Sequence, residues 1–310
     1  MGEQFEKDVI NGLSSQPKRL PSKYFYDKAG DRLFQQIMHL DEYYLTNSEL
    51  EVLTANRQDI FSAIAKGGTF DLLEFGAGDG LKTKVLLKYF LKEQANFTYR
   101  PVDISSNALK GLEANLSEEL PGLKVESIAD EYFHALNGLG NSKNRSVVLF
   151  LGSNIGNFRE EQAHRFLGEL YASLKEGDMV LIGFDLKKDP GKILAAYNDD
   201  KGITAAFNLN LLRRINRELG ADFDLEAFRH YPLYDPEAGE ARSYLVSTRE
   251  QTVQMGSRSF HFQAWETIHT EISCKYHPSE TNELARHAGF EVVRHFFDKE
   301  MNFLDALWKK

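Results

Sequence analysis

The chain has 310 residues, 42% of them apolar, which is enough to form one large hydrophobic core or two smaller ones. Its formal charge of −9 argues against a nucleic-acid partner, because phosphate binding needs clustered lysine and arginine. The single cysteine, Cys274, excludes an intramolecular disulfide and a cysteine zinc cluster, and we expect no metal site. No apolar run reaches the roughly 20 residues of a membrane span, and the charged amino terminus lacks a signal-peptide core. We therefore expect a cytoplasmic protein.

The first 50 residues show a helical pattern with turns and many aromatic side chains. Strand patterns then alternate with helical patterns, and the expected strands are 71–76, 98–102, 123–128, 146–151 and 178–184. The fourth and fifth are continuous apolar runs, as in parallel strands that are buried on both faces. This alternation predicts an α/β fold with a doubly wound sheet, whose ligand crevice lies at the carboxyl ends of the strands.

From Gly191 the pattern changes to a helix, a polar turn and a longer helix that ends at Gly220. Along the longer helix an apolar residue recurs every fourth position, which predicts a buried stripe formed by Ile203, Phe207, Leu211, Ile215 and Leu219. Three strand-like runs follow, at Arg242–Thr248, Thr252–Gln263 and Glu266–Tyr276. Two further strands, near Phe290–Val293 and Asn302–Trp308, are expected to return to the main sheet.

Three glycines spaced two apart, Gly76, Gly78 and Gly80, lie between the first strand and a helical pattern. Glycine there lets the backbone turn sharply and approach a ligand without interference from a Cβ. A dinucleotide fingerprint would place its third glycine at position 81, where this chain has Leu81. Together with Glu74, these glycines resemble the first nucleotide-binding motif of class I S-adenosylmethionine methyltransferases. An ordinary tight turn is the alternative.

Asp103 ends the next strand. A carboxylate at that position of a nucleotide-binding α/β unit can accept hydrogen bonds from ribose hydroxyls. The alternative is that Asp103 caps the helix that begins near Ser105. The preceding glycine loop favours the ligand-binding interpretation.

Asn157 follows the fourth strand, where a doubly wound fold places residues that meet the substrate. Its amide and carbonyl suit a zwitterionic amino group, although a turn asparagine is the plainer interpretation. Glu271 and Ser273 share one face of a strand, with Ile272 and Cys274 on the other. A solvated sheet edge would explain that pattern equally well, and buried tyrosines such as Tyr44 and Tyr197 are usually packing residues.

In this order the motifs resemble the histidine Nα-methyltransferases of ergothioneine biosynthesis, over nearly the whole chain. The matching blocks are Leu20–Asp27, Glu42–Thr46, Gly76–Lys84, Pro101–Ser105, Leu151–Asn157, Asp185–Pro190, Ala195–Asp199, Thr204–Asn210, Asn216–Phe223 and Thr270–Ser273. The resemblance implies transfer of three methyl groups from S-adenosylmethionine to the α-amine of histidine, which gives hercynine and S-adenosylhomocysteine.

The resemblance also implies roles for single residues. Cofactor-binding residues would be Gly76, Gly78, Lys82, Asp103 and Asp130, the last beside the adenine. Asn157 and Tyr197 would be the catalytic residues, which hold the amino and carboxylate end of the substrate. Tyr44, Glu271 and Ser273 would recognise the imidazole, and a carboxylate beside a hydroxyl suits an imidazole N–H.

The implied architecture is a class I (Rossmann-like) methyltransferase sheet with a second α+β domain, built from the amino-terminal segment and an insertion. Residues 51–190 and 277–310 would bind S-adenosylmethionine, and residues 1–50 and 191–276 would bind the substrate. We expect a monomer with a small-molecule amino-acid substrate and without nucleic-acid or membrane partners.

Two positions depart from the family pattern. The family has an acid followed by an aromatic residue where this chain has Asp130 and Glu131. It also has Ile-Glu-Met where this chain has Ala241, Arg242 and Ser243, and that methionine lines the side-chain pocket of the relatives. Two rival functions stay open: N-methylation of another aromatic amino acid such as tryptophan, or a non-catalytic module that senses an amino acid.

Overall fold

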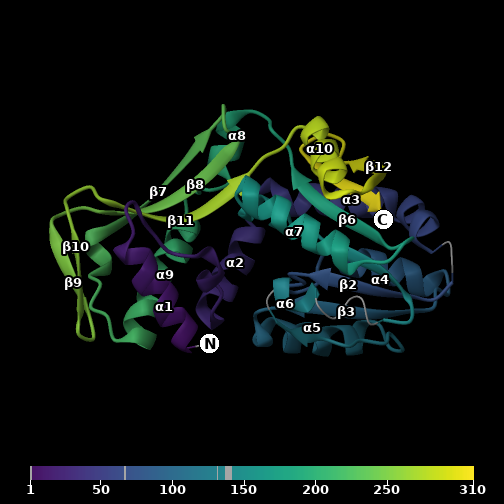
Figure 1. Ribbon diagram of the computed structural model, residues 1–310, viewed down its shortest axis with the longest axis horizontal. Helices are drawn as coiled ribbons and strands as arrows, with labels where there is room; N and C mark the ends of the chain where they lie inside the picture. The colour runs from purple at the N-terminus through teal and green to yellow at the C-terminus, as the bar shows by residue number, and fades with distance from the viewer. Residues whose placement is uncertain (1, 66–67, 131, 137–141) are drawn as a thin grey trace. The chain divides into compact units, whose positions relative to one another are not determined.

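The computed structural model describes residues 2–65, 68–130, 132–136 and 142–310, and the chain forms two compact units (Figure 1). Unit 1 contains Met1–Tyr44 and Lys188–Ser273, and unit 2 contains Leu45–Lys187 and Cys274–Lys310. We expected the chain to pass between domains at residues 50/51, 190/191 and 276/277. In the structure all three passages lie earlier, after Tyr44, Lys187 and Ser273, and the first coincides with the start of helix α3 (Tyr44–Ile64).

Unit 2 contains a seven-stranded sheet with helices on both faces. Its helices are α3 (Tyr44–Ile64), α4 (Thr83–Lys92), α5 (Ser106–Glu119), α6 (Tyr132–Leu136), the short 3₁₀ helix η3 (Asn154–Asn157), α7 (Glu160–Ser173) and α10 (Pro278–Ala288). Its strands are β2 (Phe70–Phe75), β3 (Phe97–Asp103), β4 (Ile128–Ala129), β5 (Arg145–Phe150), β6 (Met179–Asp185), β12 (Glu291–Phe297) and β13 (Phe303–Lys309).

The strand order is β12-β13-β6-β5-β2-β3-β4. Strands β4, β3, β2, β5 and β6 pair in parallel, and β13 is antiparallel to both β6 and β12. The order reverses beside β2, so the glycine loop lies at the topological switch point where doubly wound folds bind ligands. The predicted class I methyltransferase sheet is confirmed, including the return of the last two strands. The expected strand 123–128 is mostly irregular, since only a bridge at Val125 and the short strand β4 pair with β3.

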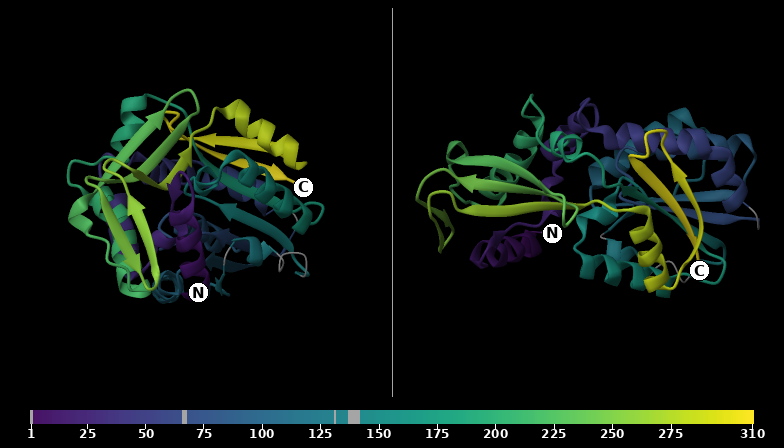
Figure 2. Two further views of the ribbon diagram at one scale, coloured as in Figure 1. Left: turned by 60° about the vertical axis from the view of Figure 1, so that its left-hand side comes forward. Right: turned by 90° about the horizontal axis from the view of Figure 1, so that it is seen from above.

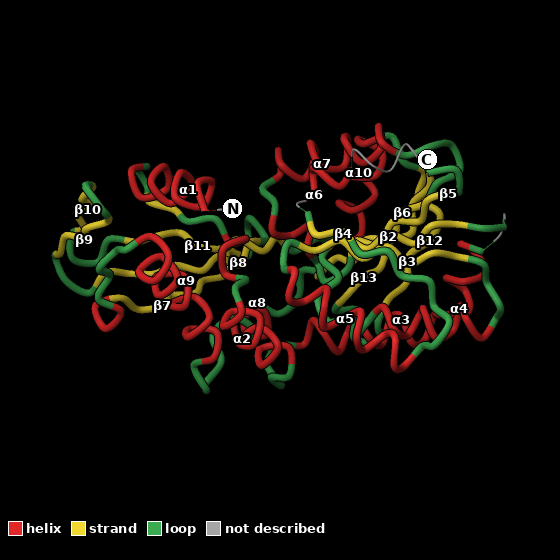
Figure 3. Tube along the Cα trace, turned by 90° about the horizontal axis from the view of Figure 1, so that it is seen from below, coloured by secondary structure: helices red, strands yellow, loops and turns green. Residues whose placement is uncertain are grey.

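Helices cover both faces of this sheet. Figure 3 shows α6, α7 and α10 on one side, with α3, α4 and α5 on the other. Every residue of β6 is buried, as its continuous apolar run predicts, and every residue of β2 is buried as well, although β2 includes Asp71 and Glu74. Aromatic side chains such as Phe150, Phe166 and Trp308 fill the layer between the sheet and α7 and α10. The rigid sheet therefore fixes the positions of the loops that follow its strands.

Unit 1 contains a four-stranded sheet in the order β1-β11-β8-β7, a separate hairpin, and helices that pack on one another and on the strands. Its helices are α1 (Gly2–Ser14), η1 (Ser22–Phe25), α2 (Lys28–Met38), α8 (Pro190–Ala195), α9 (Ile203–Leu219) and η4 (Leu225–Ala227). Its strands are β1 (Lys18–Arg19), β7 (Phe228–Asp235), β8 (Glu240–Ser247), β9 (Gln251–Met255), β10 (Arg258–Phe262) and β11 (Thr267–Cys274).

The apolar stripe predicted on α9 is confirmed. Phe207, Leu211 and Ile215 are buried among residues of α1 and β8, and Gly220 ends the helix in the left-handed conformation, with φ of 64°. Burial of this stripe joins the amino-terminal helix to the inserted segment within one core.

One strand prediction in unit 1 was wrong, and one strand of this unit was not predicted. The run Thr252–Gln263 is not one strand but the hairpin β9–β10, which turns at Gly256 with φ of 59° and lies at one end of the unit 1 sheet (Figure 2). Strand β7 was not predicted, because Pro232 interrupts its pattern. Proline is tolerated there since β7 is an edge strand that pairs only with β8 within the described sheet. Within the described residues, no helix has the length and apolar character needed to cross a membrane.

Candidate active site

The glycine loop of unit 2 is shaped by three residues with left-handed backbone: φ is 73° at Gly76, 55° at Gly78 and 67° at Gly80. A Cβ at Gly76 would lie 2.6 Å from the Tyr132 hydroxyl and 2.7 Å from Nδ2 of Asn154. A Cβ at Gly78 would meet no atom within 4 Å. The first glycine is therefore required by protein packing, whereas Gly78 faces open space that a ligand can enter.

Asp103 lies beside this loop at the end of β3. Its Oδ2 accepts a hydrogen bond from the Gly78 N–H at 3.0 Å, and its Oδ1 accepts one from the Ser105 N–H at 2.8 Å. The cap of α5 is Ser105, whose hydroxyl oxygen accepts from the N–H of Ala108. Burial raises the pKa of Asp103, although the two backbone N–H groups oppose that rise. Asp103 thus fixes the glycine loop and keeps a carboxylate at the carboxyl edge of the sheet.

Asp130 follows β4 and is tied to the same edge, because its backbone N–H donates to the Asp103 carbonyl at 3.2 Å. Its carboxylate is half-buried and lies 3.4 Å from His134. The structure therefore brings Asp103 and Asp130 side by side. Glu131, the other residue of the departure from the family pattern, lies outside the described residues.

Glu74 is buried under the glycine loop, and its carboxyl group accepts hydrogen bonds from the hydroxyls of Thr83 and Tyr99. Burial raises the pKa of Glu74 to about 7, with the two hydroxyls and Lys82 opposing. The Glu74 carboxyl group thus connects strand β2 to the first turn of α4. Glu74 therefore stabilises the glycine loop from its buried side and is not exposed at the open space beside Gly78.

Lys82 precedes α4 and forms an ion pair with Glu49 of α3. The same Glu49 carboxylate accepts the Gly152 N–H at 2.7 and 3.0 Å. This ion pair places the Lys82 ammonium beside the loop after β5, which also contains Asn157. Asn157 itself is exposed at the end of η3.

The residues expected to recognise the side chain of the substrate lie in unit 1. Glu271 is half-buried on β11, and its Oε2 accepts a hydrogen bond from the Ser243 hydroxyl of β8 at 3.3 Å. Ser273 is buried, and so is Ile272. The simple alternation of buried and open positions therefore fails at the end of β11, where the chain leaves unit 1 after Ser273.

Tyr44 and Tyr197 lie near the ends of helices in the same unit. The Tyr44 hydroxyl accepts from Lys188 at 2.8 Å, and the ammonium groups of Lys188 and Lys192 lie 4.3 and 5.3 Å from the centre of its ring. Tyr197 follows α8, the helix that contains Lys192, and is buried. Tyr44 and α8 are thus neighbours, and Lys188 is a candidate residue that the motif analysis missed.

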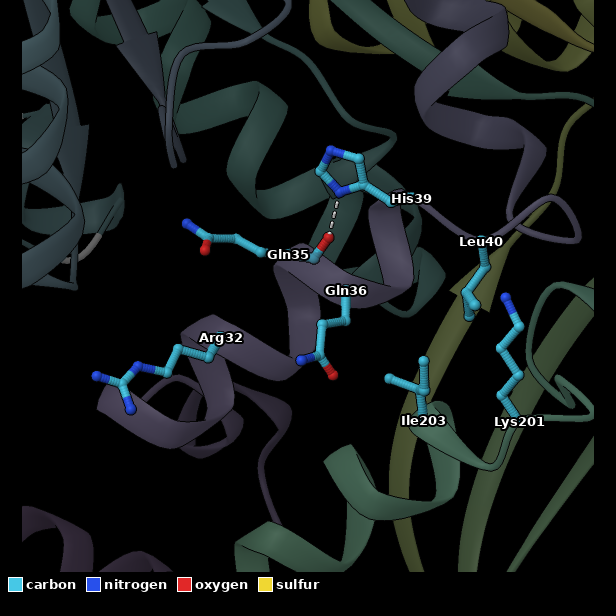
Figure 4. Close-up of a pocket in the computed structure, with 7 residues that line it drawn as sticks. All are labelled: Arg32, Gln35, Gln36, His39, Leu40, Lys201 and Ile203. Carbon is cyan, nitrogen blue, oxygen red and sulfur yellow. Dashed lines mark hydrogen bonds between the residues drawn. The ribbon is translucent and has the colours of Figure 1, made fainter.

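A surface hollow of about 460 Å³ in unit 1 contains none of these residues (Figure 4). It is lined by Arg32, Gln35, Gln36, His39, Leu40, Lys201 and Ile203. Nδ1 of His39 already forms a hydrogen bond with the Gln35 carbonyl oxygen, at 2.6 Å. All seven lining residues lie outside the sequence blocks that resemble the family, so the hollow is not the candidate site.

Sequence reasoning missed Glu49 as a neighbour of the candidate site and gave Asn154, which lies within a matching block, no role of its own. Glu49 and Asn154 contact the glycine-loop region only through packing of distant segments, so no local pattern signals them. Ser243 was noticed as a departure from the family pattern. Its hydrogen bond to Glu271 becomes visible only when β8 and β11 are paired.

Comparison with known proteins identifies the family. Residues 5–310 match the model of the family described as histidine-specific methyltransferase, SAM-dependent. The histidine N-alpha-methyltransferase of Mycolicibacterium smegmatis is 35% identical over 303 residues, 97% of this chain and 93% of that protein. The protein of the same name from Mycobacterium tuberculosis is 34% identical over 96% of this chain and 92% of its own length. Ergothioneine biosynthesis protein 1 of Neurospora crassa is 32% identical over 89% of this chain, which spans 32% of that longer protein. The chain therefore belongs to the histidine-specific, S-adenosylmethionine-dependent methyltransferases.

Proposed function

We propose that this protein transfers three methyl groups in turn from S-adenosylmethionine to the α-amino nitrogen of L-histidine, giving hercynine. The observation that supports this most is the match to the histidine-specific family over residues 5–310. Two curated relatives named for the same activity each match more than nine-tenths of this chain.

The residues at the carboxyl edge of the unit 2 sheet fit the cofactor. Open space at Gly78 admits a ligand close to the backbone, and the Asp103 carboxylate can accept hydrogen bonds from ribose hydroxyls. Gly76 and Lys82 would complete the loop around the cofactor, and Asp130 would lie beside the adenine. When bound, S-adenosylmethionine supplies a methyl group on a sulfonium sulfur that is already a good leaving group.

The protein's own task is mainly to position the amine. Asn157 and Tyr197 would hold the amino and carboxylate end of the substrate so that the nitrogen lone pair is aligned for in-line displacement. The amine must lose its proton before each transfer, and water or the substrate carboxylate can accept it. No dedicated general base is required, and positioning is the larger contribution to the rate.

Recognition of the imidazole would depend on Tyr44, Glu271 and Ser273. A carboxylate that accepts an imidazole N–H discriminates strongly against a phenyl ring, because the phenyl ring offers it no donor. Ser243 already donates one hydrogen bond to Glu271 and so holds that carboxylate on the β8–β11 pair.

A second candidate function is N-methylation of a larger aromatic amino acid such as tryptophan. Ser243 favours it, because a small buried side chain stands where the family pattern has methionine, which leaves more room. The Ser243→Met variant tests this: it should lower tryptophan turnover relative to histidine turnover. An unchanged ratio would remove Ser243 from the specificity determinants.

Mass spectrometry of reactions with histidine, tryptophan and tyrosine tests the proposal. We expect histidine to gain three methyl groups in step with the appearance of S-adenosylhomocysteine. A non-catalytic sensor would bind an amino acid and yield no S-adenosylhomocysteine. A preference for tryptophan would replace the first candidate by the second.

A further inference from the structure

Two buried carboxyl groups from distant parts of unit 2 meet beside Gly183. Glu49 comes from α3 and Asp305 from β13, and both are 0% exposed. Gly183 pairs with Asp305 in the sheet. A Cβ at Gly183 would collide with Oε1 of Glu49 and would lie 3.2 Å from Oδ1 of Asp305. The missing side chain at Gly183 therefore makes room for the two carboxyl groups together.

Glu49 is well supplied with donors. The Gly152 N–H donates to both of its oxygens, and the Lys82 ammonium forms an ion pair with Oε2. Gly152 has a left-handed backbone, with φ of 74°, and a Cβ there would lie 3.1 Å from the Lys82 nitrogen. Glu49 and Gly152 thus hold the Lys82 ammonium against the loop after β5.

Asp305, in contrast, lacks donors: neither of its carboxyl oxygens accepts a hydrogen bond from any described group. A bare carboxylate without a donor is costly in a buried position. Burial and the neighbouring Glu49 both raise the pKa of Asp305 well above its usual range, with Lys82 opposing. A proton on Asp305 would give that group a donor directed at Glu49, the carboxylate that already pairs with the Lys82 ammonium.

We propose that Glu49 and Asp305 share one proton and that this pair positions Lys82 in the cofactor site. Glu49 supplies the negative charge that pairs with the ammonium, and protonated Asp305 donates to Glu49 and keeps it in place. Both are positioning residues, because their effect on the cofactor passes through Lys82. The role of the pair rests on the proposed contact of Lys82 with S-adenosylmethionine.

Infrared spectroscopy tests the shared proton without any methyl transfer. Protein labelled with carbon-13 in the aspartate carboxyl is measured at about pH 8.5, where the Glu74 carboxyl, with its pKa of about 7, is mostly ionised. We expect the band of a protonated carboxylic acid that shifts with the label and disappears in Asp305→Asn. Absence of this band from the wild type, or its persistence in the variant, would overturn the proposal. Failure to methylate histidine would leave this result unaffected.

A double-mutant cycle tests the link to Lys82, with calorimetric affinity for S-adenosylmethionine as the readout. Glu49→Gln removes the charge that pairs with the ammonium and should weaken binding more than Asp305→Asn, which keeps that charge. Because Asp305 acts through Glu49, its substitution should add little once Glu49 is changed, so the loss in the double variant should be smaller than the product of the single losses. Losses that simply multiply would contradict the shared role.

Glu51→Gln is the matched control for this cycle. It removes an acid from the same helix, but the partner of Glu51 is the exposed Lys299, at 3.4 Å. Its cofactor affinity should equal that of the wild type.

Discussion

The glycine-loop edge of unit 2 and the β8–β11 pair of unit 1 both gather predicted binding residues, but they fix them in different ways. At the edge of the sheet, Gly78 is held by its backbone conformation and Asp103 by hydrogen bonds that its carboxylate accepts from backbone N–H groups. On the β8–β11 pair, Glu271 is held by a side-chain hydrogen bond from Ser243, a residue on another strand.

The first region would bind a cofactor that many enzymes share, and the second would select one substrate. A backbone-built loop accepts a cofactor that many enzymes share, and it tolerates few changes at its glycines. Side chains such as Ser243 and Glu271 can be substituted one at a time, and each substitution alters which substrate the site accepts. We therefore expect changes in the glycine loop and at Asp103 to affect cofactor binding and folding, and changes on β8 and β11 to affect substrate choice.

Glu271→Ala should have the largest effect on activity. It removes the carboxylate expected to accept the imidazole N–H, so kcat/KM for histidine should fall by about one to three orders of magnitude. Thermal stability and cofactor affinity should stay close to those of the wild type. Steady-state kinetics with histidine measures this, and wild-type turnover in the variant would mean that Glu271 is only a solvated edge residue.

Gly76 and Gly78 form a matched pair within the loop. Gly76→Ala adds a Cβ that clashes with Tyr132 and Asn154 at a left-handed position, which should cost about 2–4 kcal/mol of stability. Gly78→Ala meets only the conformational penalty, about 1–2 kcal/mol. Urea unfolding of both variants compares them, and equal losses would show that packing around Gly76 is not what requires glycine.

Asp103→Ala should weaken binding of S-adenosylmethionine by about 1–3 kcal/mol, the loss expected for charge-assisted hydrogen bonds to ribose hydroxyls. Calorimetry on the folded variant gives the value. Affinity equal to that of the wild type would leave Asp103 with the local role that its bonds to Gly78 and Ser105 already describe.

Glu74 should make stability depend on pH. Its pKa is about 7 in the folded protein against an ordinary 4.5, so below pH 4.5 both states hold the proton. Between these values only the folded state keeps it, and stability should fall as pH rises, by at most about 3 kcal/mol. Glu74→Gln removes this term. The difference between wild type and variant in urea unfolding should therefore change between pH 4.5 and 8, and a constant difference would contradict the assignment.

The sequence was most informative where local geometry decides the structure. Alternating strands and helices predicted the sheet of unit 2, and the glycine spacing predicted the position of its loop. Strand β7 was not predicted because it contains Pro232, and proline is tolerated only in an edge strand. Whether a strand lies at the edge depends on the pairing of distant segments, which no local pattern reveals.

The same limit applies to the candidate site. Glu49 lies 33 positions before Lys82 in the sequence, and no periodicity connects the two. The contact between Ser243 and Glu271 likewise depends on strand pairing. Residues whose roles depend on long-range packing were found through the resemblance to a family or only through the structure.

The central claim is that the α-nitrogen of histidine receives three methyl groups. The most direct measurement is nuclear magnetic resonance of the product made from histidine and S-adenosylmethionine labelled with carbon-13 in its methyl group. We predict a single signal from three equivalent methyl groups, coupled through the nitrogen to the α-carbon of histidine. Label on an imidazole nitrogen, or no labelled histidine at all, would contradict the proposed function.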